Sequence, residues 1–586
     1  MKVVGGEKGE KTKDIENRDN EVVLRRIISP KYPIDPYELL GFRNFKTPRI
    51  VPKEEVGTPV QEFFRDATVF LTGGTGFLGH VLIEKLLRCC PHINQIYVLV
   101  RMKRNKSPAD RFETILQDPL FDRLRYEVPN FREKISYVSG CIDQPLLGLS
   151  EEDRSKISKD VNIIYHCAAT VNFNEMLAEA IKVNTMGTRE LIKVARDVKS
   201  LKALLYVSTA YSFCNHIDVG EKLYPMHIEP EAMIELVEQK SATELETEVA
   251  TYIKDWPNTY VFSKALAEWL ILKEVSDLPV AILRPSQIIS TWKEPLRGWI
   301  NNMYGPLGLF LGFGLGILHI YEGDLRDETV DMVPVDMVVN SLICATKEVA
   351  LNHKIKSNLN EAVPIYNYAN ASQNQTTWKY ILNICTDEVV KYWGFSNAIW
   401  YPSYIPVTYR PVHPIVNLFL HRIPGLLMDF ILSLMKREPV LTKVYRKLDK
   451  VCDTLSGEPE LSPKPEILSE LTTLRYFRLR KWLFKIDNVQ NLWKNLSPED
   501  KEIFYFDVKQ INWAKYAQFY ALGIRVFIMK DDIQTLPAAR KKLTRLYIIH
   551  QLTKFIFYSL LTLFGMYMLI RFIEYRVNDL ILHSKQ

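Results

Sequence analysis

Residues 69–82 read VFLTGGTGFLGHVL, which is an apolar run, a glycine-rich turn and the beginning of a helical pattern. The turn satisfies GxGxxG from Gly74 and GxxGxxG from Gly73. Glycines permit a tight turn and let the backbone approach a pyrophosphate, which then faces the free N–H groups at the helix N-terminus. A purely structural glycine turn is the alternative, but the flanking strand and helix favour the phosphate site. The sequence therefore predicts a dinucleotide-binding turn made of Gly73, Gly74, Thr75, Gly76, Phe77, Leu78 and Gly79.

Apolar runs continue to alternate with helical patterns on the carboxyl side of this turn. Runs that are apolar throughout are typical of strands buried on both faces, as in a parallel sheet covered by helices. We therefore predict an α/β fold, a Rossmann-like doubly wound parallel sheet, over roughly residues 63–345. The strand candidates are 67–72, 96–100, 134–138, 162–168, 204–209 and 280–285.

The composition is that of a packed globular protein. The 586 residues are 47% hydrophobic and 25% charged, which excludes a mainly disordered, collagenous or disulfide-scaffold chain. The net charge of +6 is spread too thinly to predict a nucleic-acid partner. The eight cysteines form no CxxC pair, so neither a zinc ribbon nor a thioredoxin-type site is predicted, and we expect no metal.

Four segments follow from these changes in pattern. Residues 1–62 form a charged N-terminal tail and a proline-rich lead-in, and residues 63–345 form the nucleotide-binding domain. Residues 346–540 form a second, mostly α-helical domain, with a loop predicted at 453–465 from its turn composition. Residues 541–586 contain a hydrophobic helix and a short tail.

The hydrophobic helix is predicted to be a single C-terminal membrane anchor. Phe555–Ile570 is free of charge for 16 residues, whereas a bilayer core takes about 20. Extending the run back to Leu546 adds length and includes His550 and Lys554, which can snorkel. A buried or interfacial helix is the alternative. The N-terminus has no apolar signal sequence, so we expect the bulk of the protein in the cytosol. The carboxyl-terminal HSKQ differs from a peroxisomal SKL signal, and we favour the endoplasmic reticulum.

A basic cluster follows the second predicted strand. An NAD-preferring site usually has an acidic residue there, which holds the ribose hydroxyls. This chain has Arg101, followed by Lys103 and Arg104. Because a guanidinium is a permanently charged, forked donor suited to phosphate, Arg101 predicts binding of the NADP 2′-phosphate. A solvated basic turn is the alternative.

Tyr260 and Lys264 are the candidate catalytic pair. They are four residues apart in a helical pattern and so share one helix face. A tyrosine can donate a proton to a carbonyl oxygen as hydride arrives at the carbon, and a neighbouring ammonium is expected to lower the phenol pKa. Thr209 ends an apolar strand and can supply a second hydroxyl, a role for which Ser208 is the competitor.

Other polar residues have simpler interpretations. His166 lies in an apolar strand and is predicted to be a core histidine, and Asn184 is predicted to be structural. Two apolar segments leave alternatives open. Residues 304–317 can form a lipid-contacting loop or a buried connection. Residues 414–435 can line an acyl tunnel, lie on a membrane, or form a core helix pair.

With these residues in view, the sequence resembles the fatty acyl-CoA reductases of the extended short-chain dehydrogenase/reductase superfamily, and the insect-type members most closely. In the first domain the resemblance rests on TGGTGFLG, VLVR, VSTAY, YVFSKALAE and VPVDMVVN. In the second it rests on RYFRLRKWLF (475–484), NVQNLWKNLSPEDKEIFYFDV (488–508) and NWAKYAQFYALGIRVFIMKDD (512–532).

The resemblance implies NADPH-dependent reduction of long-chain fatty acyl-CoA to a primary fatty alcohol, with two hydride transfers and release of CoA. It implies that Tyr260 is the general acid, that Lys264 orients the nicotinamide ribose, and that Thr209 takes the Ser/Thr position. Chain length, aldehyde release and oligomeric state are not predicted. The alternatives are a sugar-nucleotide epimerase or dehydratase and a non-catalytic, membrane-tethered lipid-binding relative.

Three positions depart from the family pattern. Cys141 stands where the family usually has an aspartate, a change expected to weaken adenine binding. Leu315 and His319 stand where basic residues are usual, which puts the CoA or acyl contacts in question.

Overall fold

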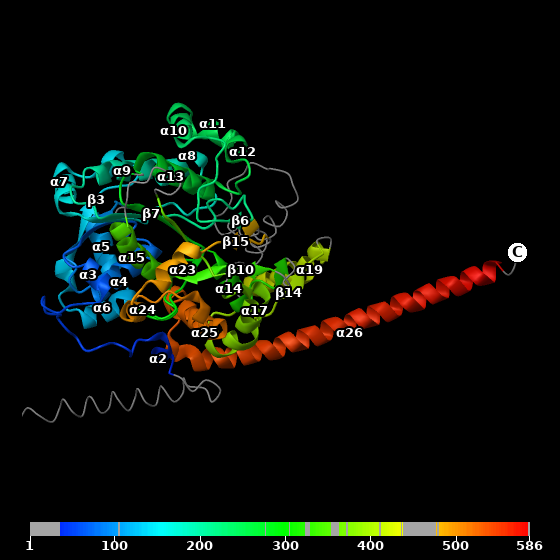
Figure 1. Ribbon diagram of the computed structural model, residues 1–586. Coiled ribbons are helices and arrows are strands. Elements are labelled where there is room, and N and C mark those ends of the chain that lie inside the picture. The colour runs from blue at the N-terminus through cyan, green and yellow to red at the C-terminus, as the bar shows by residue number, and fades with distance from the viewer. Residues whose placement is uncertain are drawn as a thin grey trace, which may run out of the picture.

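A seven-stranded parallel sheet forms the centre of the computed structural model (Figure 1). The structure describes residues 35–103, 106–275, 277–303, 305–322, 328–352, 363–370, 373–409, 412–434, 436, 476–477 and 480–583. The predicted tail before residue 35, the predicted loop at 453–465 and Arg104 lie outside the described residues.

The strands occur in the order β12-β7-β5-β4-β1-β2-β3, and each pairs in parallel with its neighbours. The central strand β1 pairs on one side with β2, with Val69 opposite Ile96, and on the other with β4, with Val69 opposite Ile163. The six predicted strands are confirmed, and β12 is a seventh strand that was not predicted. The strands are β1 (Thr68–Thr72), β2 (Gln95–Val100), β3 (Ile135–Ser139), β4 (Ile163–His166), β5 (Ala203–Val207), β7 (Val280–Pro285) and β12 (Ile365–Tyr368).

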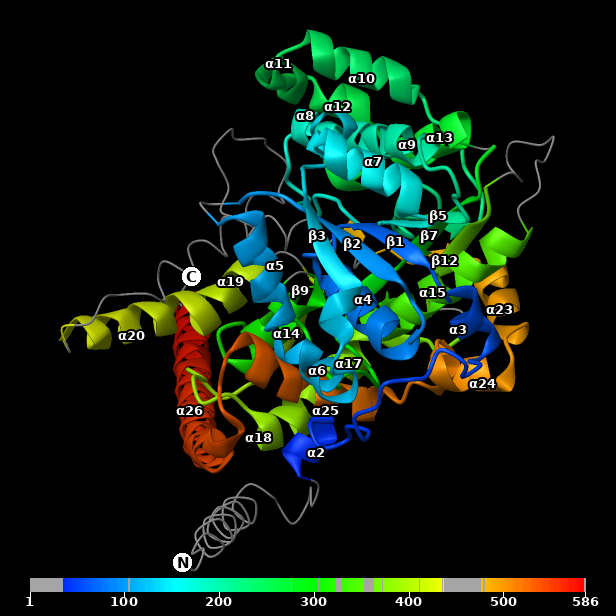
Figure 2. The ribbon, with the colours of Figure 1, turned by 90° about the vertical axis from the view of Figure 1, so that its left-hand side faces the viewer.

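Both faces of the sheet are buried, which explains why its strands are apolar throughout. In β1, Val69 and Leu71 belong to one core and Phe70 to the other. Helices α4 (Phe77–Cys89) and α15 (Val335–Asn352) cover the first face. Helices α7 (Glu151–Asp160), α9 (Gly187–Arg196) and α13 (Thr259–Val275) cover the second (Figure 2). The doubly wound architecture is therefore confirmed.

The strand order locates the crevice in which such sheets bind ligands. The chain leaves β1 toward β2 and β3, then returns to the other side of β1 with β4 and β5. This reversal opens a crevice beyond the carboxyl ends of β1 and β4. The glycine-rich turn follows β1 directly, and Thr209 lies two residues after β5.

The carboxyl-terminal part is mostly helical and packs against the lead-in and the first face of the sheet. Its apolar residues continue the core that α4 and α15 form, for example through Trp513 and Tyr516. The predicted boundary at 345 stays a prediction, although the last sheet strand, β12, follows it. The described helices of the lead-in are α2 (Pro36–Leu40) and α3 (Pro59–Phe63). Helices of the carboxyl-terminal part include α17 (Trp378–Asn383), η5 (Ile384–Val389), α18 (Val390–Trp393), α23 (Asp487–Lys494), α24 (Pro498–Ile503) and α25 (Trp513–Gly523).

The segment 304–317 is a buried connection over its described residues. It forms α14 (Pro306–Gly314), whose Phe310 packs edge-on against Tyr520 with ring centroids 5.2 Å apart. The lipid-contacting interpretation is therefore wrong for this helix. The segment 414–435 differs, because α20 (Ile423–Leu434) exposes Leu426, Leu427 and Phe430 by about 60% each. These side chains do not form a core.

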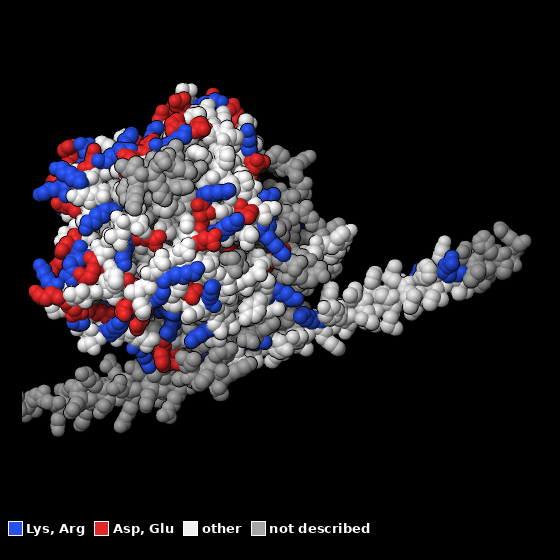
Figure 3. All heavy atoms as spheres, viewed as in Figure 1, with Lys and Arg blue, Asp and Glu red and all other residues white. Residues whose placement is uncertain are grey.

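The C-terminal helix α26 (Leu536–His583) projects from the globular part (Figure 1). The helical stretch Ile533–Val577, which includes most of α26, is long and apolar enough to cross a membrane, with a mean hydropathy of 1.8 and no buried residue in its most apolar stretch. Figure 3 shows basic and acidic side chains interspersed over the globular part and few along this helix. The helix suggests a membrane anchor.

Candidate active site

The glycine-rich turn needs glycine for steric reasons. Gly73 has a φ of +77°, and a Cβ on it would lie 2.5 Å from the backbone of Cys167 and Ala168. A Cβ on Gly79 would lie 2.3 Å from the Gly73 carbonyl oxygen. These contacts bring β1, α4 and the segment after β4 together with no room for a side chain.

The turn delivers the N-terminus of α4 to the crevice. Gly76 is the N-cap residue, no side chain caps the helix, and its first turn contains no acidic residue. The uncapped N–H groups of a 13-residue helix suit a pyrophosphate. The glycines and this helix end therefore fit the phosphates of a dinucleotide.

Two arginines lie beside the turn. The Arg111 Nη2 donates to the Thr75 Oγ1 at 3.2 Å, and its Nη1 donates to the carbonyl oxygen of Arg101. Burial, together with the charge of Arg101, lowers the pKa of Arg111. Two guanidinium groups beside a glycine-rich turn are suited to binding an anion. The sequence analysis found Arg101 and missed Arg111, because its position depends on how the loop returns to the turn.

Lys264 is buried beneath the crevice. It is 2% exposed, and its Nζ donates to the Val207 carbonyl oxygen at 2.7 Å and to the Tyr206 hydroxyl at 3.2 Å. Burial lowers its pKa to about 8, against the opposing effects of Cys167 and Glu268. Since Cys167 also touches the Gly73 turn, the ammonium lies next to the nucleotide crevice.

Tyr260 begins the helix that carries Lys264. Burial raises its pKa, and a hydrogen bond with Thr209 opposes that shift. The two hydroxyls that the sequence analysis selected are thus brought together. The expected lowering of the Tyr260 pKa by Lys264 is wrong for this structure, because the ammonium is held by Val207 and Tyr206. Tyr260 is a neutral phenol at neutral pH.

The Ser208 hydroxyl is hydrogen-bonded to another side chain, so Ser208 does not take the role predicted for Thr209. Its hydroxyl donates to Glu268, whose carboxylate also accepts from the Arg284 Nε at 3.1 and 3.0 Å. Both charged side chains are fully buried. Arg284 also donates to the carbonyl oxygens of Gly220 and Lys222. This ion pair joins α13 to β7 and was missed, although an arginine in an apolar strand and a glutamate four residues after Lys264 were visible signals.

His166 and Asn184 have structural partners. The ring of His166 is shared between the Thr72 and Thr188 hydroxyls, at 2.7 and 3.1 Å, and burial lowers its pKa to about 3. Asn184 donates to the Ser263 Oγ at 2.9 Å and so joins its helix to α13. Both residues support the crevice from below.

Aromatic side chains from three segments form an apolar wall that begins at Tyr260. The Phe173 ring lies 5.5 Å from the ring of Tyr260 and 5.8 Å from that of Phe477. Phe477 in turn packs edge-on against Tyr211 at 5.0 Å. This apolar wall was not predicted, since it joins residues more than 200 positions apart.

Comparisons with known proteins agree over both parts of the chain. Two family models, each described as male sterility protein, match residues 71–342 and 466–531, and the first is a nucleotide-binding model. The chain is 37% identical over 506 residues to the fatty acyl-CoA reductase wat of Drosophila melanogaster, which covers 86% of this chain and 92% of the relative. The chain belongs to the fatty acyl-CoA reductase family.

Other family members and solved structures are also similar to it. Identity to fatty acyl-CoA reductase 1 of Rattus norvegicus is 38% over 499 residues, covering 83% of this chain and 89% of the relative. The terminal R domain of the myxalamid PKS-NRPS pathway has a TM-score of 0.48 and 19% identity, and the match covers 86% and 96% of the two chains. Residues 71–342 of this fatty acyl-CoA reductase, which the nucleotide-binding family model matches, form an NAD(P)-binding domain.

The three departures from the family pattern have the following positions in this reductase. Cys141 follows β3, and its N–H donates to the Leu147 carbonyl oxygen at 2.8 Å. Leu315 and His319 are at most 9% exposed. The His319 N–H donates to the ring of His421 at 3.1 Å, and its Nδ1 bonds the Ser403 carbonyl oxygen. The Ile399 N–H donates to the Leu315 carbonyl oxygen at 2.8 Å, so both residues join the segment after α14 to the helical part.

Proposed function

We propose that this oxidoreductase reduces long-chain fatty acyl-CoA to a primary fatty alcohol with release of CoA. The observation that carries the proposal is the pairing of the Tyr260 and Thr209 hydroxyls beside a dinucleotide crevice, with the Lys264 ammonium buried beneath. Family membership selects the substrate class from the many that this fold can serve.

The chain's own residues bind and polarise the reacting carbonyl. The Tyr260 and Thr209 hydroxyls donate to the carbonyl oxygen and stabilise the negative charge that develops on it. When bound, NADPH supplies hydride, and two hydrides are needed to take a thioester to an alcohol. Because its pKa is raised, Tyr260 holds the proton that the oxygen receives when the alcohol forms.

Lys264 acts on the ribose side of the crevice. Its ammonium is fixed by the Val207 carbonyl oxygen and lies near Cys167, against the Gly73 turn. A third ammonium proton can be donated to a ribose hydroxyl. We therefore assign it the orientation of the nicotinamide ribose.

The aromatic wall suits an alkyl chain. The Phe173 ring packs against the ring of Tyr260, and Phe477 and Tyr211 extend this apolar wall away from it. Burial of alkyl chain contributes about 0.8 kcal/mol per CH₂, so apolar contacts of this kind dominate the affinity for a long acyl chain.

We propose NADPH as the cofactor, and not NADH, because two guanidinium groups lie beside the glycine-rich turn. The Arg101 and Arg111 guanidinium groups beside the turn support binding of a 2′-phosphate, as does the lack of an acidic residue after β2 at the position that holds ribose hydroxyls in NAD sites.

The anchor places this chemistry at a membrane. Arg540, Lys541, Lys542 and Arg545 precede the apolar run, and Arg571 and Arg576 follow it. The larger positive charge on the globular side supports a cytosolic location for that side. The endoplasmic reticulum is the proposed organelle, and co-fractionation with markers of that membrane and of peroxisomes tests it.

The deciding experiment incubates membranes containing the full-length protein with palmitoyl-, stearoyl- or oleoyl-CoA and NADPH. We expect fatty alcohol and free CoA, identified by gas chromatography and a thiol assay. A parallel arm supplies nucleotide sugars. Turnover of a nucleotide sugar without fatty alcohol would select the epimerase or dehydratase alternative, and the absence of both turnover and NADPH binding in a fluorescence titration would select the lipid-binding one.

A further inference from the structure

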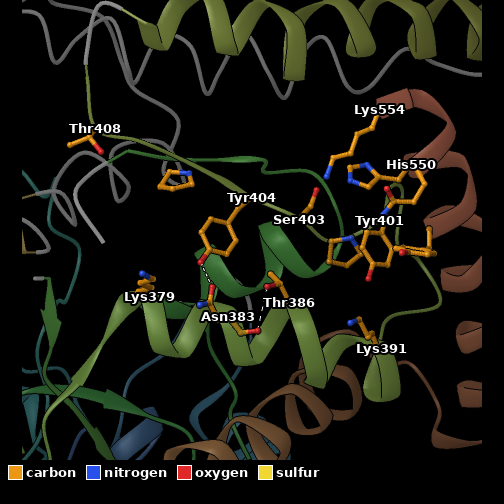
Figure 4. Close-up of a pocket in the computed structure, with 14 residues that line it drawn as sticks. Lys379, Asn383, Thr386, Lys391, Tyr401, Ser403, Tyr404, Thr408, His550 and Lys554 are labelled. Atoms are coloured by element: carbon orange, nitrogen blue, oxygen red, sulfur yellow. Dashed lines mark hydrogen bonds between the residues drawn. The ribbon is translucent and has the colours of Figure 1, made fainter. Parts of the chain in front are cut away.

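A pocket of about 600 Å³ lies where α26 leaves the globular part (Figure 4). Its walls come from α17, η5 and α18, from the segment 401–408, and from residues 547–554 of α26. None of its lining residues belongs to the central sheet, the glycine-rich turn or α13. It is therefore distinct from the candidate active site, and its size is that of a small-ligand site.

The pocket is positively charged. Lys379 and Lys391 enter it from the α17–α18 side and Lys554 from α26 (Figure 4). Among the described residues that line it there is no aspartate or glutamate. None of the three lysines makes an ion pair with a carboxylate within the described part of the chain. Three ammonium groups that face one cavity repel one another, and a bound anion relieves that repulsion.

Neutral donors complete the lining. The Trp400 indole N–H donates to the His550 Nδ1 at 3.0 Å, so the Nε2 of the neutral ring carries the proton. The Ser403 hydroxyl also lines the cavity. Hydroxyl and imidazole donors among lysines suit the oxygens of a phosphate group.

The pocket lies at the edge of the membrane segment. Lys554 is the last charged residue before the uncharged run Phe555–Ile570. Just inside that run, the Phe557 ring lies 5.7 Å from that of Phe419, which precedes the exposed apolar residues of α20. When α26 spans a bilayer, the pocket is therefore at the depth of the phospholipid headgroups, next to apolar side chains that contact acyl chains.

We propose that this pocket binds the phosphate of an anionic membrane phospholipid. The phosphates of CoA share that chemistry, but the position directly above the membrane segment favours the lipid. A lipid bound between α26 and the α17–α18 side holds the globular part against the bilayer surface.

The test uses the full-length protein in a neutral detergent, titrated with fluorescent phosphatidic acid and, in parallel, with fluorescent phosphatidylcholine. The variant combines Lys379→Gln, Lys391→Gln and Lys554→Gln. A lysine near an anionic lipid contributes about 1 kcal/mol, or roughly fivefold, so we expect affinity for phosphatidic acid to fall by the order of 100-fold. Affinity for phosphatidylcholine should change much less.

The matched control removes three exposed lysines that neither line the pocket nor belong to α26: Lys159→Gln, Lys199→Gln and Lys509→Gln. We expect it to bind phosphatidic acid within about threefold of the unmodified protein, since non-specific surface attraction is small. Unchanged thermal midpoints confirm that both variants are folded.

Three results would overturn the proposal. They are unchanged binding by the pocket variant, an equal loss by the control, and displacement of phosphatidic acid by free CoA at concentrations at which inorganic phosphate has no effect. The last result would assign the pocket to the phosphates of CoA. Retained NADPH-dependent reduction of palmitoyl-CoA by the pocket variant in detergent would keep the outcome separate from the proposed catalytic site.

Discussion

Replacing Arg111 with leucine is expected to reduce the preference for NADPH over NADH. The Arg111 guanidinium lies within hydrogen-bonding distance of Thr75 in the glycine-rich turn and close to Arg101. A hydrogen bond to a charged group contributes about 1.5–3 kcal/mol. Because Arg111 is partly exposed, we take the lower part of that range, about 1.5–2 kcal/mol, which is roughly 10- to 30-fold in kcat/KM for NADPH.

The assay measures kcat/KM for NADPH and for NADH with one acyl-CoA at saturation. For the Arg111→Leu variant we expect the NADPH value to fall and the NADH value to change by less than about twofold, because NADH has no 2′-phosphate. Arg132→Gln is the matched control. It removes an exposed guanidinium that is paired with Glu113, a residue on the same helix as Arg111 (Pro108–Leu116) but away from the turn. An equal loss for both cofactors would refute the assignment of this anion site to the 2′-phosphate.

Three further predictions follow. Since the pKa of Lys264 is about 8 and its charged form is the active one, kcat/KM should be constant below that pH and fall as the pH rises through it, and a flat profile to pH 10 would contradict the role. Glu268→Gln leaves the Arg284 guanidinium buried without its partner and should cost about 3–5 kcal/mol of stability. A lower thermal midpoint measures that loss, whereas exposed Glu235→Gln should have little effect, and equal midpoints would contradict the argument. Removal of residues 546–586 should release the protein from carbonate-washed membranes, and retention there would show that other segments anchor it.

Much of the sheet could be predicted because its strands are apolar on both faces. The strand that contains Val69 and Phe70 can be identified from the sequence for that reason. Strand β12 was missed because Asn367 interrupts its apolar pattern. The Asn367 side chain is fully buried and donates to the carbonyl oxygens of Val219 and Lys485, at 3.1 and 2.8 Å. Hydrogen-bond partners so far apart along the chain cannot be predicted from a local sequence pattern.

The candidate active site could also be predicted only in part. Helical spacing places Tyr260 and Lys264 on one face, and the end of an apolar strand indicates Thr209. Sequence spacing does not give the state of the side chains, because burial decides it. The pKa of Tyr260 is raised, and the hydroxyl of Ser208 is taken by Glu268. These outcomes depend on tertiary packing.

The rate of NADPH-dependent reduction of palmitoyl-CoA by the Tyr260→Phe variant tests the central claim most directly. Loss of a general acid costs about 10²–10⁴ in rate, so we predict at least a 100-fold fall in alcohol formation with unchanged binding of NADPH. Tyr252→Phe, which removes a surface hydroxyl paired with Lys240, should keep the normal rate. Alcohol formation by the Tyr260→Phe variant at a rate close to that of the unmodified protein would contradict the account.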